Sequence, residues 1–359
     1  MGKRTIIPFG PQHPVLPEPV HLDLVLEDEK VIEAIPQIGY VHRGLEKLTE
    51  KREFTELVYV IERVCGICSF GHGLGYCMSV EENMKITIPK RAELLRTLLH
   101  ELARVHSHLL WLGLLADSFG FESLFMHSWR LRETVLDLLE EATGGRIIFS
   151  ICKIGGLHHD LSNDMVNKIV LTLDGMLKEL KELTDVFLDD FSVKKRLVNL
   201  GKLSPELAAE LGAVGPFAKA SGLDIDMRSN GHAGYKYVKF KTITDDGGDS
   251  YARAKVRIGE IYQSIDIIKQ VANILEDGTI AVPVKGTPAG KAISRLEQPR
   301  GEAFYISIGD GTKHLKRFRV RTPTNANIPA MLEVLKGVDL ADVPLIILTI
   351  DPCISCTER

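Results

Sequence analysis

The sequence predicts a mainly helical α+β fold, with a β-rich N-terminal part, a core of long helices and a small β element before a buried C-terminus. Three observations support this prediction. Apolar residues alternate with other residues between positions 20 and 26, as in a half-buried strand. From about Gly44 the apolar spacing becomes that of helices. Residues 343–350 (VPLIILTI) form an apolar run that would be costly to leave in water.

The elements follow from these patterns in order. The alternating face at 20–26 predicts one strand, and the charged stretch at 27–30 predicts a turn into a second strand at 31–35. Helices are expected over 47–63, 68–83, 90–117, 122–143, 163–190, 250–276 and 326–337, and strands over 302–308 and 315–321. Residues 212–250 are rich in Gly, Pro and Asp, which predicts a long loop. No linker divides the chain, so we expect one domain with a β-rich part at 1–43, a mainly helical core at 44–300 and an α/β part at 301–359.

Composition excludes several classes of protein. The chain has 359 residues, a formal net charge of −4 and scattered Lys and Arg, so a nucleic-acid partner is not expected. It contains no apolar stretch of about 20 residues that would span a membrane, and its N-terminus lacks the apolar run of a signal peptide. Six cysteines, four of them in Cys-x-x-Cys pairs, indicate a metal site in a reducing cytoplasm rather than a disulfide framework.

The two Cys-x-x-Cys pairs lie at distant positions of the chain. Cys65 and Cys68 occur in RVCGICSFGH, and Cys353 and Cys356 occur in DPCISCTER. A Cys-x-x-Cys turn lets two sulfurs reach one ion about 2.3 Å from each. Burial of the apolar run before Cys353 would carry the second pair inward, so the sequence predicts a four-thiolate centre inside the protein.

Spacing alone leaves the metal open. A structural Cys₄ zinc site is one interpretation, because zinc commonly occupies paired Cys-x-x-Cys turns. Thiolates also bind copper(I), iron-sulfur clusters, nickel and iron. The wide separation of the pairs and the polar residues near them, Arg63, His72 and Asp351, are not typical of a zinc ribbon.

Both cysteine segments resemble the nickel-binding motifs of nickel-iron hydrogenase large subunits. Other stretches are similar to the complex I subunit that descends from these hydrogenases, namely FGPQHPVLPEP, GYVHRGLEKLTE, ARVHSHLLWLGLLAD, TGGRI, GGLHHDL, GPFAKASG and EQPRGE. That subunit has lost the cysteines, whereas this chain keeps all four. The chain is therefore identified as a member of the membrane-bound, energy-converting (Ech-type) branch, and the resemblance implies the nickel-iron hydrogenase large-subunit fold.

The resemblance implies a nickel and an iron bound by the four cysteines. All four would bind nickel, with Cys68 and Cys356 bridging to iron, and the iron would carry one carbon monoxide and two cyanides. Four thiolates and two cyanides outweigh divalent nickel and iron by two negative charges. Burying that charge without a cation nearby would be expensive.

Candidate groups around the metals also come from the resemblance. Arg300, in EQPRGE, matches the arginine that lies over the metals and hydrogen-bonds a cyanide, and Asp351 and Asp117 match carboxylates that hold it. His72 is expected to donate to a bridging sulfur. In heterolytic hydrogen chemistry, the thiolate of Cys353 would be the first proton acceptor.

Two glutamates complete the expected set. Glu18 matches the family's proton relay next to the terminal thiolate. Glu46, in HRGLEK, matches a ligand of magnesium or a similar ion. This chain has Arg359 where relatives that bind the ion have a histidine, so a Glu46–Arg359 salt bridge is the alternative that we favour. We expect structural roles for His13 and for His106, His108, His158 and His159.

Only Cys77 and Cys152 remain, and they are expected to be buried small apolar residues. Two cysteines cannot hold a 4Fe-4S cluster, so electrons would leave through another polypeptide. The resemblance implies a small subunit with such a cluster, a ferredoxin-type iron-sulfur subunit and integral membrane ion-translocating subunits, with this chain peripheral on the cytoplasmic face. The expected function is a ferredoxin-linked hydrogenase that reduces protons reversibly. The alternatives are a complex I-like coupling subunit without hydrogenase activity and a structural Cys₄ zinc protein.

Overall fold

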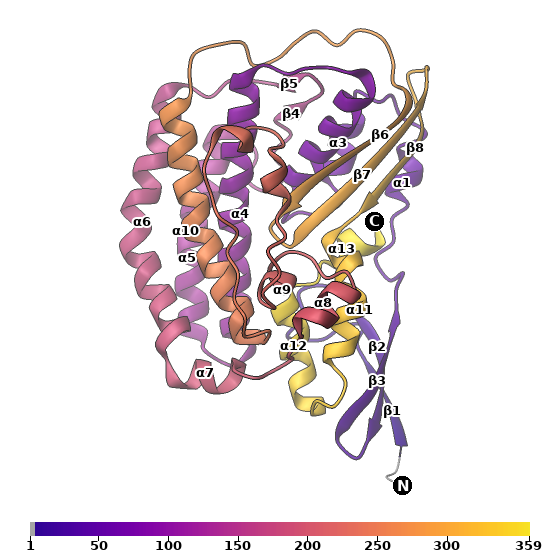
Figure 1. Ribbon diagram of the computed structural model, residues 1–359, viewed down its shortest axis with the longest axis vertical. Coiled ribbons are helices and arrows are strands. Elements are labelled where there is room, and N and C mark those ends of the chain that lie inside the picture. Colours follow the sequence, from indigo (N-terminus) through magenta and orange to yellow (C-terminus); the bar gives the residue numbers. More distant parts are fainter. Residues whose placement is uncertain (1–3) are drawn as a thin grey trace.

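A computed structural model describes residues 4–359 and shows a helical core flanked by two three-stranded sheets (Figure 1). The N-terminal sheet consists of β1 (Arg4–Phe9), β2 (His21–Glu27) and β3 (Lys30–Gln37), paired antiparallel in chain order. Leu22, Leu24 and Leu26 are its buried face. The predicted β-rich start is therefore confirmed.

Four long helices form the core: α4 (Lys90–Ser118), α5 (Glu122–Thr143), α6 (Asn163–Asp189) and α10 (Ser250–Ile274). In the bundle, α4 packs against α5 and α10, while α6 packs against α5 and α10 (Figure 1). Repeated apolar spacing made all four predictable to within two residues at each end. The buried leucines of α4 that we expected at helical spacing, Leu94 to Leu109, lie in the main hydrophobic core.

Shorter helices connect these elements. They are α1 (Leu45–Leu48), α2 (Leu57–Glu62), α3 (Ser69–Met84), α7 (Phe191–Leu197), α8 (Pro205–Glu210), α9 (Pro216–Lys219), α11 (Pro323–Val334), α12 (Val343–Ile350) and α13 (Ile354–Glu358). The single helix predicted over 47–63 is wrong, because residues 49–56 leave helical geometry between α1 and α2. The expected long loop at 212–250 is largely irregular but includes α9 and two 3₁₀ turns, η1 (Met227–Asn230) and η2 (Tyr235–Tyr237).

The second sheet packs on α3 at one side of the bundle. It contains β6 (Ala289–Gln298), β7 (Gly301–Asp310) and β8 (Leu315–Arg321), all antiparallel, and α3 packs on β6 and β7. A two-stranded ribbon, β4 (Cys152–Lys153) with β5 (Gly156–Leu157), and a last 3₁₀ turn, η3 (Leu340–Asp342), complete the described elements. Strand β6 was not predicted.

The apolar run before the second cysteine pair forms helix α12 and is buried, as expected. Trp111 of α4 donates from Nε1 to the carbonyl of Leu348 over 2.8 Å. The helix ends at Asp351, which has a left-handed φ of 63°, and Pro352 follows it. This turn directs the chain into α13, beside α11 (Figure 1).

No helix among residues 4–359 combines the length and the apolar character needed to cross a membrane.

Candidate metal centre

The four cysteines of the two pairs come together inside the protein. Cys65 lies in the turn between α2 and α3, and Cys68 immediately precedes α3. Cys353 precedes α13, and Cys356 lies within it. Each of the four is at most 3% exposed. The buried tail therefore brings residues 288 positions apart in the chain into contact.

The sulfur atoms have the spacing of shared metal ligands. Cys68 Sγ lies 3.3 Å from Cys356 Sγ, and Cys65 Sγ lies 3.4 Å from Cys353 Sγ. The sulfurs of Cys65, Cys68 and Cys356 are all within 4.8 Å of one another. Two sulfurs about 2.3 Å from one ion can be up to about 4.6 Å apart, so the arrangement fits thiolate ligands around a soft metal.

The protonation of these thiols is strongly coupled. Hydrogen bonds from Cys353 and Cys356 hold the pKa of Cys68 well below its usual range, whereas burial raises the pKa of Cys356 well above it. One thiolate therefore forms readily, but four adjacent buried thiolates require compensating positive charge. A metal ion would supply that charge, and the donor set accordingly fits the nickel and iron implied by the motifs.

Arg300 and Asp351 form an ion pair beside the cysteines. Arg300 Nη2 donates to Asp351 Oδ1 over 2.8 Å, and its Nε donates to the Asp351 carbonyl over 2.9 Å. Burial opposes the charge of Arg300, but Asp351 and the nearby thiolates raise its pKa well above the usual value. Nη1 of Arg300 and Oδ2 of Asp351 are buried without a hydrogen-bond partner among residues 4–359. An unpaired N–H beside the sulfurs is suited to an acceptor such as a cyanide nitrogen.

Asp117 does not join this pair, so that expectation is wrong. It lies exposed in the last turn of α4. The α4 residue near the cysteines is His106. Its Nε2 lies 3.0 Å from the carbonyl oxygen of Ile67, which stands between Cys65 and Cys68 in the chain. Eleven residues of helix separate His106 from Asp117, about 16 Å at 1.5 Å per residue. The second side chain near Asp351 is instead Arg257 of α10, which donates to the carbonyl of Ile350 over 3.2 Å.

Glu18 lies beside the second cysteine pair. Its Oε1 is 3.9 Å from Cys353 Sγ, and its carboxylate accepts hydrogen bonds from the backbone N–H groups of Ile354 and Ser355 and from the Ser355 hydroxyl. The side chain is half-buried. It therefore connects the sulfur of Cys353 with the partly solvated segment before β2.

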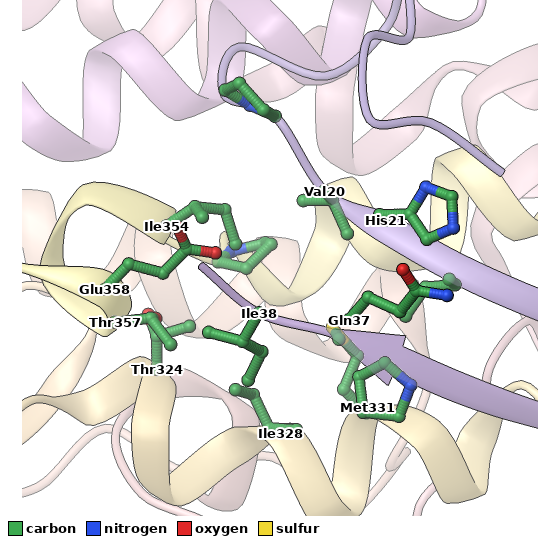
Figure 2. A pocket seen from close by; sticks show the side chains of 14 residues that line it. Val20, His21, Gln37, Ile38, Thr324, Ile328, Met331, Ile354, Thr357 and Glu358 are labelled. Atoms are coloured by element: carbon green, nitrogen blue, oxygen red, sulfur yellow. The ribbon is translucent and has the colours of Figure 1, made fainter. Parts of the chain in front are cut away.

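A shallow pocket lies on the other side of this tail. Its walls come from the ends of β2 and β3, from α11 and from α13, where Ile354, Thr357 and Glu358 point toward it (Figure 2). Ile38, Ile328 and Met331 make it mainly apolar. None of its 14 lining residues is a cysteine, so this pocket is separate from the four-thiol site.

His72 connects the sulfurs to the second sheet through a chain of hydrogen bonds. Its Nε2 lies 3.3 Å from Cys356 Sγ, and its Nδ1 lies 3.1 Å from the hydroxyl of Tyr305. Gln298 donates from Nε2 to the same hydroxyl over 2.7 Å. The hydroxyl has two acceptors in reach, His72 Nδ1 and the carbonyl oxygen of Gly71 at 3.3 Å. When it donates to Nδ1, the nearer of the two, the histidine proton is on Nε2 and points at the sulfur. Sequence reasoning identified His72 but missed Tyr305 and Gln298, which are contacts between distant segments.

Glu46 is surrounded by arginines. Arg359 Nε donates to Glu46 Oε1 over 2.8 Å, and Arg319 and Arg317 lie 3.1 Å and 3.6 Å from Oε2. The backbone N–H of Val320 also donates to Oε1. The structure thus contains the salt bridge that we favoured. Three guanidinium groups around one carboxylate do not fit a magnesium ion, because cations would repel it.

The other residues considered lie away from the sulfurs or have structural contacts. Arg63 is exposed and donates to the carbonyl of Tyr59, so it does not point into the site. His13 stacks on Phe9. Cys77 and Cys152 are fully buried and outside the four-cysteine group.

Comparison with known proteins gives two family matches. Residues 43–116, which include the first cysteine pair, match the nickel-dependent hydrogenase family. Residues 118–287 and 282–359 match the family of the 49 kDa subunit of respiratory-chain NADH dehydrogenase. Membrane-bound hydrogenase subunit alpha of Pyrococcus furiosus is 35% identical over 98% of this chain and 87% of its own length.

This chain belongs to the family of nickel-dependent hydrogenase large subunits and the related 49 kDa respiratory subunit. The family prediction is thereby confirmed. Other members include the carbon monoxide-induced hydrogenase of Rhodospirillum rubrum, 37% identical over 98% of this chain and 99% of that protein. Formate hydrogenlyase subunit 5 of Escherichia coli is 38% identical, but the chain spans only 63% of its length.

The fold of this hydrogenase-family chain also matches a solved structure. A chain of the membrane-bound sulfane sulfur reductase, an archaeal respiratory membrane complex, superposes with a TM-score of 0.94, 28% sequence identity and coverage of 99% and 98% of the two chains. The predicted large-subunit fold is thereby confirmed. The family contains both hydrogenase subunits and NADH-quinone oxidoreductase subunits, so membership does not by itself assign the reaction.

Proposed function

We propose that this chain is the catalytic large subunit of a ferredoxin-linked nickel-iron hydrogenase that reduces protons reversibly to hydrogen. The observation that carries the proposal is the buried group of four cysteines, with sulfur pairs 3.3 Å and 3.4 Å apart. A subunit that only couples other subunits has no need for four thiols in one interior site. An adjacent unpaired guanidinium N–H favours a centre with anionic ligands over structural zinc.

The four cysteines would hold the metals, with Cys68 and Cys356 bridging nickel and iron. When bound, the nickel-iron pair with its carbon monoxide and two cyanides supplies the redox chemistry that forms or splits hydrogen. Arg300 would donate from Nη1 to a cyanide, and Asp351 keeps its guanidinium in place through two hydrogen bonds. The −2 charge inferred for such a centre is also why a buried cation is needed here.

Protons would move through Cys353 and Glu18. The Cys353 sulfur accepts a proton, and Glu18 takes it at Oε1, 3.9 Å away. A small closing motion brings these atoms into hydrogen-bond range, as often happens when a catalytic site is occupied. Glu18 then releases the proton toward the partly solvated segment that carries it.

The chain would act at the cytoplasmic face of the cell membrane as part of a complex. Its electrons would pass through a small subunit with a 4Fe-4S cluster and a ferredoxin-type subunit, and integral membrane partners would translocate ions. Two observations support this assembly: several relatives are subunits of membrane complexes, and among residues 4–359 the cysteines left after the four-thiol site are Cys77 and Cys152.

The decisive experiment is metal analysis with infrared spectroscopy on chain matured together with its accessory proteins. We expect one nickel and one iron per chain and the stretching bands of carbon monoxide and cyanide. Cys356→Ser should lose iron and the bands, whereas Cys77→Ala, the matched control at a buried cysteine outside the site, should keep both. Zinc alone would indicate a structural site, and absence of all metals would favour the coupling-subunit alternative.

The proton relay needs its own test. Glu18→Gln keeps the size of the side chain but cannot carry the proton, so it should abolish turnover and proton–deuterium exchange while metal content and infrared bands stay unchanged. The variant Gln12→Glu changes the charge of the same segment by one unit at an exposed position, so it is the control for a general effect of charge. Unchanged exchange in Glu18→Gln would refute the relay.

A further inference from the structure

A second cluster of charged side chains lies buried between α4, α9, α10 and the end of β6. It contains four carboxylates and three cations, and every side chain in it is at most 2% exposed. The carboxylates are Glu101, Asp226, Glu260 and Glu297, and the cations are Arg104, Lys219 and Arg228. None of these residues contributes to the metal centre described above.

Lys219 is at the middle of this cluster. Its Nζ donates to Asp226 over 2.7 Å and to Glu260 and Glu297 over 2.9 Å each. A lysine ammonium has three N–H donors, so one cation is shared among three carboxylates. Lys219 lies in the segment GPFAKASG, and nothing in that segment alone predicts this role.

The cluster has one negative charge too many if every group is in its usual state. Two further titratable groups contact the cluster. His108 Nε2 lies 2.8 Å from Glu260 Oε2, and the Tyr235 hydroxyl donates to Glu101. Burial lowers the pKa of His108 to about 4 and raises the pKa of Tyr235 well above its usual value, so neither adds charge at neutral pH. An uncompensated buried charge is expensive, and such a group neutralises instead. Four acids against three bases leave one negative charge among the groups in contact. Arg257 on α10 offsets part of this charge from a distance, and a proton shared by the carboxylates neutralises the rest.

Glu297 is the carboxylate that holds this proton most easily. Glu101 accepts hydrogen bonds from Arg104, Arg228, Tyr235 and Ser264. Asp226 is held by both Arg228 and Lys219, and Glu260 by Lys219 and His108. Glu297 has only a share of Lys219 and the backbone N–H of Met227, at 3.1 Å.

The surroundings of Glu297 as a whole favour its protonated form. Burial raises the pKa of its carboxyl to about 7, with Lys219 opposing the rise and Asp226 adding to it. Arg104 of α4 donates to the backbone carbonyl of Glu297 over 2.7 Å rather than to its carboxylate. Arg228, which lies in η1, has its guanidinium on Asp226 and Glu101.

Two elements connect this cluster directly with the metal centre. Glu297 is three residues before Arg300, across the tight connection from β6 to β7. On α10, Glu260 is one turn after Arg257, which contacts the carbonyl next to Asp351. Since charges in a protein interior are poorly screened, a change of charge at the metal site acts on the proton affinity of the cluster.

We propose that Glu297 is an internal proton-exchange site, which takes up a proton when the neighbouring metal centre gains an electron and releases it when the electron leaves. The coupling rests on the proposed hydrogenase function, while the proton site itself does not. The electron would come from the iron-sulfur partner, and the proton from solvent. Only the O–H bond of the carboxyl forms or breaks.

The backbone of η1 lies between the carboxyl of Glu297 and solvent. Glu297 accepts its hydrogen bond from Met227, the first residue of η1, and the next residues with exposed side chains are Ser229 and Asn230. A local opening of this single 3₁₀ turn would expose the carboxyl, and it would also release Arg228 of the same turn from Glu101 of α4 and Gln263 of α10. The site thus has an exit distinct from the Glu18 segment.

The test is an infrared pH titration of the full chain without metal, in water and in D₂O. All samples carry Glu62→Gln, because burial raises the pKa of Glu62 to about 7 as well. We expect a protonated-carboxyl band that disappears as the pH rises through neutrality and is absent in Glu297→Gln. Absence of the band from the parent, or its persistence in Glu297→Gln, would overturn the proton site.

A second variant keeps the test decisive if Glu297→Gln folds poorly. Glu260→Gln leaves three acids and three bases, so Glu297 should lose its proton at lower pH and the band should disappear earlier. Leu171→Ala, at an exposed position of α6, is the control and should leave the titration unchanged. A later midpoint in Glu260→Gln would contradict the charge count.

The coupling is tested on metal-loaded enzyme. Reduction should move the midpoint of the Glu297 band to higher pH, and Glu297→Gln should remove the corresponding pH dependence of the carbon monoxide stretching frequency. Equal midpoints in oxidised and reduced enzyme would refute the coupling. Failure of the proposed function would appear differently, as missing nickel and iron with the metal-free titration intact.

Discussion

The hydrogen-bond chain behind the metal centre gives the sharpest prediction, for Tyr305→Phe. The hydroxyl of Tyr305 is buried and contacts His72 Nδ1 at 3.1 Å, Gln298 Nε2 at 2.7 Å and the carbonyl oxygen of Gly71 at 3.3 Å. Removing the hydroxyl leaves two buried side-chain atoms, His72 Nδ1 and Gln298 Nε2, without this partner. We also expect His72 to lose the constraint that points its Nε2 proton at Cys356.

The magnitude follows from the number of unpaired groups. An unsatisfied buried polar group costs about 1–3 kcal/mol, so the two groups left by Tyr305→Phe should lower the free energy of unfolding by about 2–6 kcal/mol. For 359 residues, an unfolding entropy of about 2.1 cal/mol/K per residue converts this into a fall in Tm of roughly 3–8 °C.

Tyr76→Phe is the matched control. Tyr76 is also buried and also packs on Phe318, but its hydroxyl donates only to the carbonyl of Phe54. Loss of the Tyr76 hydroxyl should lower the free energy of unfolding by about 1 kcal/mol, which corresponds to a fall in Tm of roughly 1 °C. Thermal unfolding by circular dichroism and infrared spectra of the metal-loaded proteins measure both effects.

Two results together would refute the reasoning. Tyr305→Phe would have to match Tyr76→Phe in Tm, and its carbon monoxide and cyanide bands would have to coincide with those of the parent protein. In that case His72 is positioned by packing alone, and the hydroxyl of Tyr305 has no part in orienting it.

Three further changes test separate parts of the structure. Burial raises the pKa of Glu62 to about 7 from about 4.5; the folded state then binds more protons than the unfolded state between these values, and stability falls as pH rises through this window. Glu62→Gln should therefore stabilise by about 3 kcal/mol near pH 8 and not below about pH 4.5, and equal Tm gains at both pH values would contradict this. Arg359→Ala should cost about 1 kcal/mol at low salt and less at high salt, since Glu46 is only partly buried; a salt-independent loss of Tm would argue against an ion pair. Ile347→Ala, in fully buried α12, should cost about 2–5 kcal/mol and speed metal loss to a chelator, whereas unchanged metal retention would show that α12 does not support the tail.

The sequence predicted the long helices well because each repeats its apolar spacing over many turns. It did not predict β6, because the buried face of that strand mixes Ala292, Ser294, Leu296 and Gln298 and lacks a run of large apolar residues. Ser294, on this face, donates to the carbonyl of Gly75 over 2.8 Å. A Cβ on Gly75 would lie 2.2 Å from the ring of Tyr305, so α3 approaches the sheet too closely for large residues.

The candidate site, like the fold, could be predicted from the sequence only in part. Cysteine spacing and short motifs were sufficient to nominate Cys65, Cys353, Arg300 and Glu18, which the structure brings close together. Motif matching failed at Asp117. The location of a side chain on a long helix depends on its distance along the helix and on the face that it shares, and a short motif specifies neither. Motif matching also missed Lys219, whose three carboxylate partners come from three separate segments of the chain.

The left-handed turn at Asp351 makes the last residues comparable to a tethered ligand. Beyond it, α13 is held by hydrogen bonds to segments distant in the chain, among them those of Glu18, Thr322 and Glu46. A short tether gives such a ligand an effective concentration on the order of millimolar. The second cysteine pair is therefore joined to the helical bundle through one turn, and we expect exchange of metal to need motion at that turn rather than unfolding of the bundle.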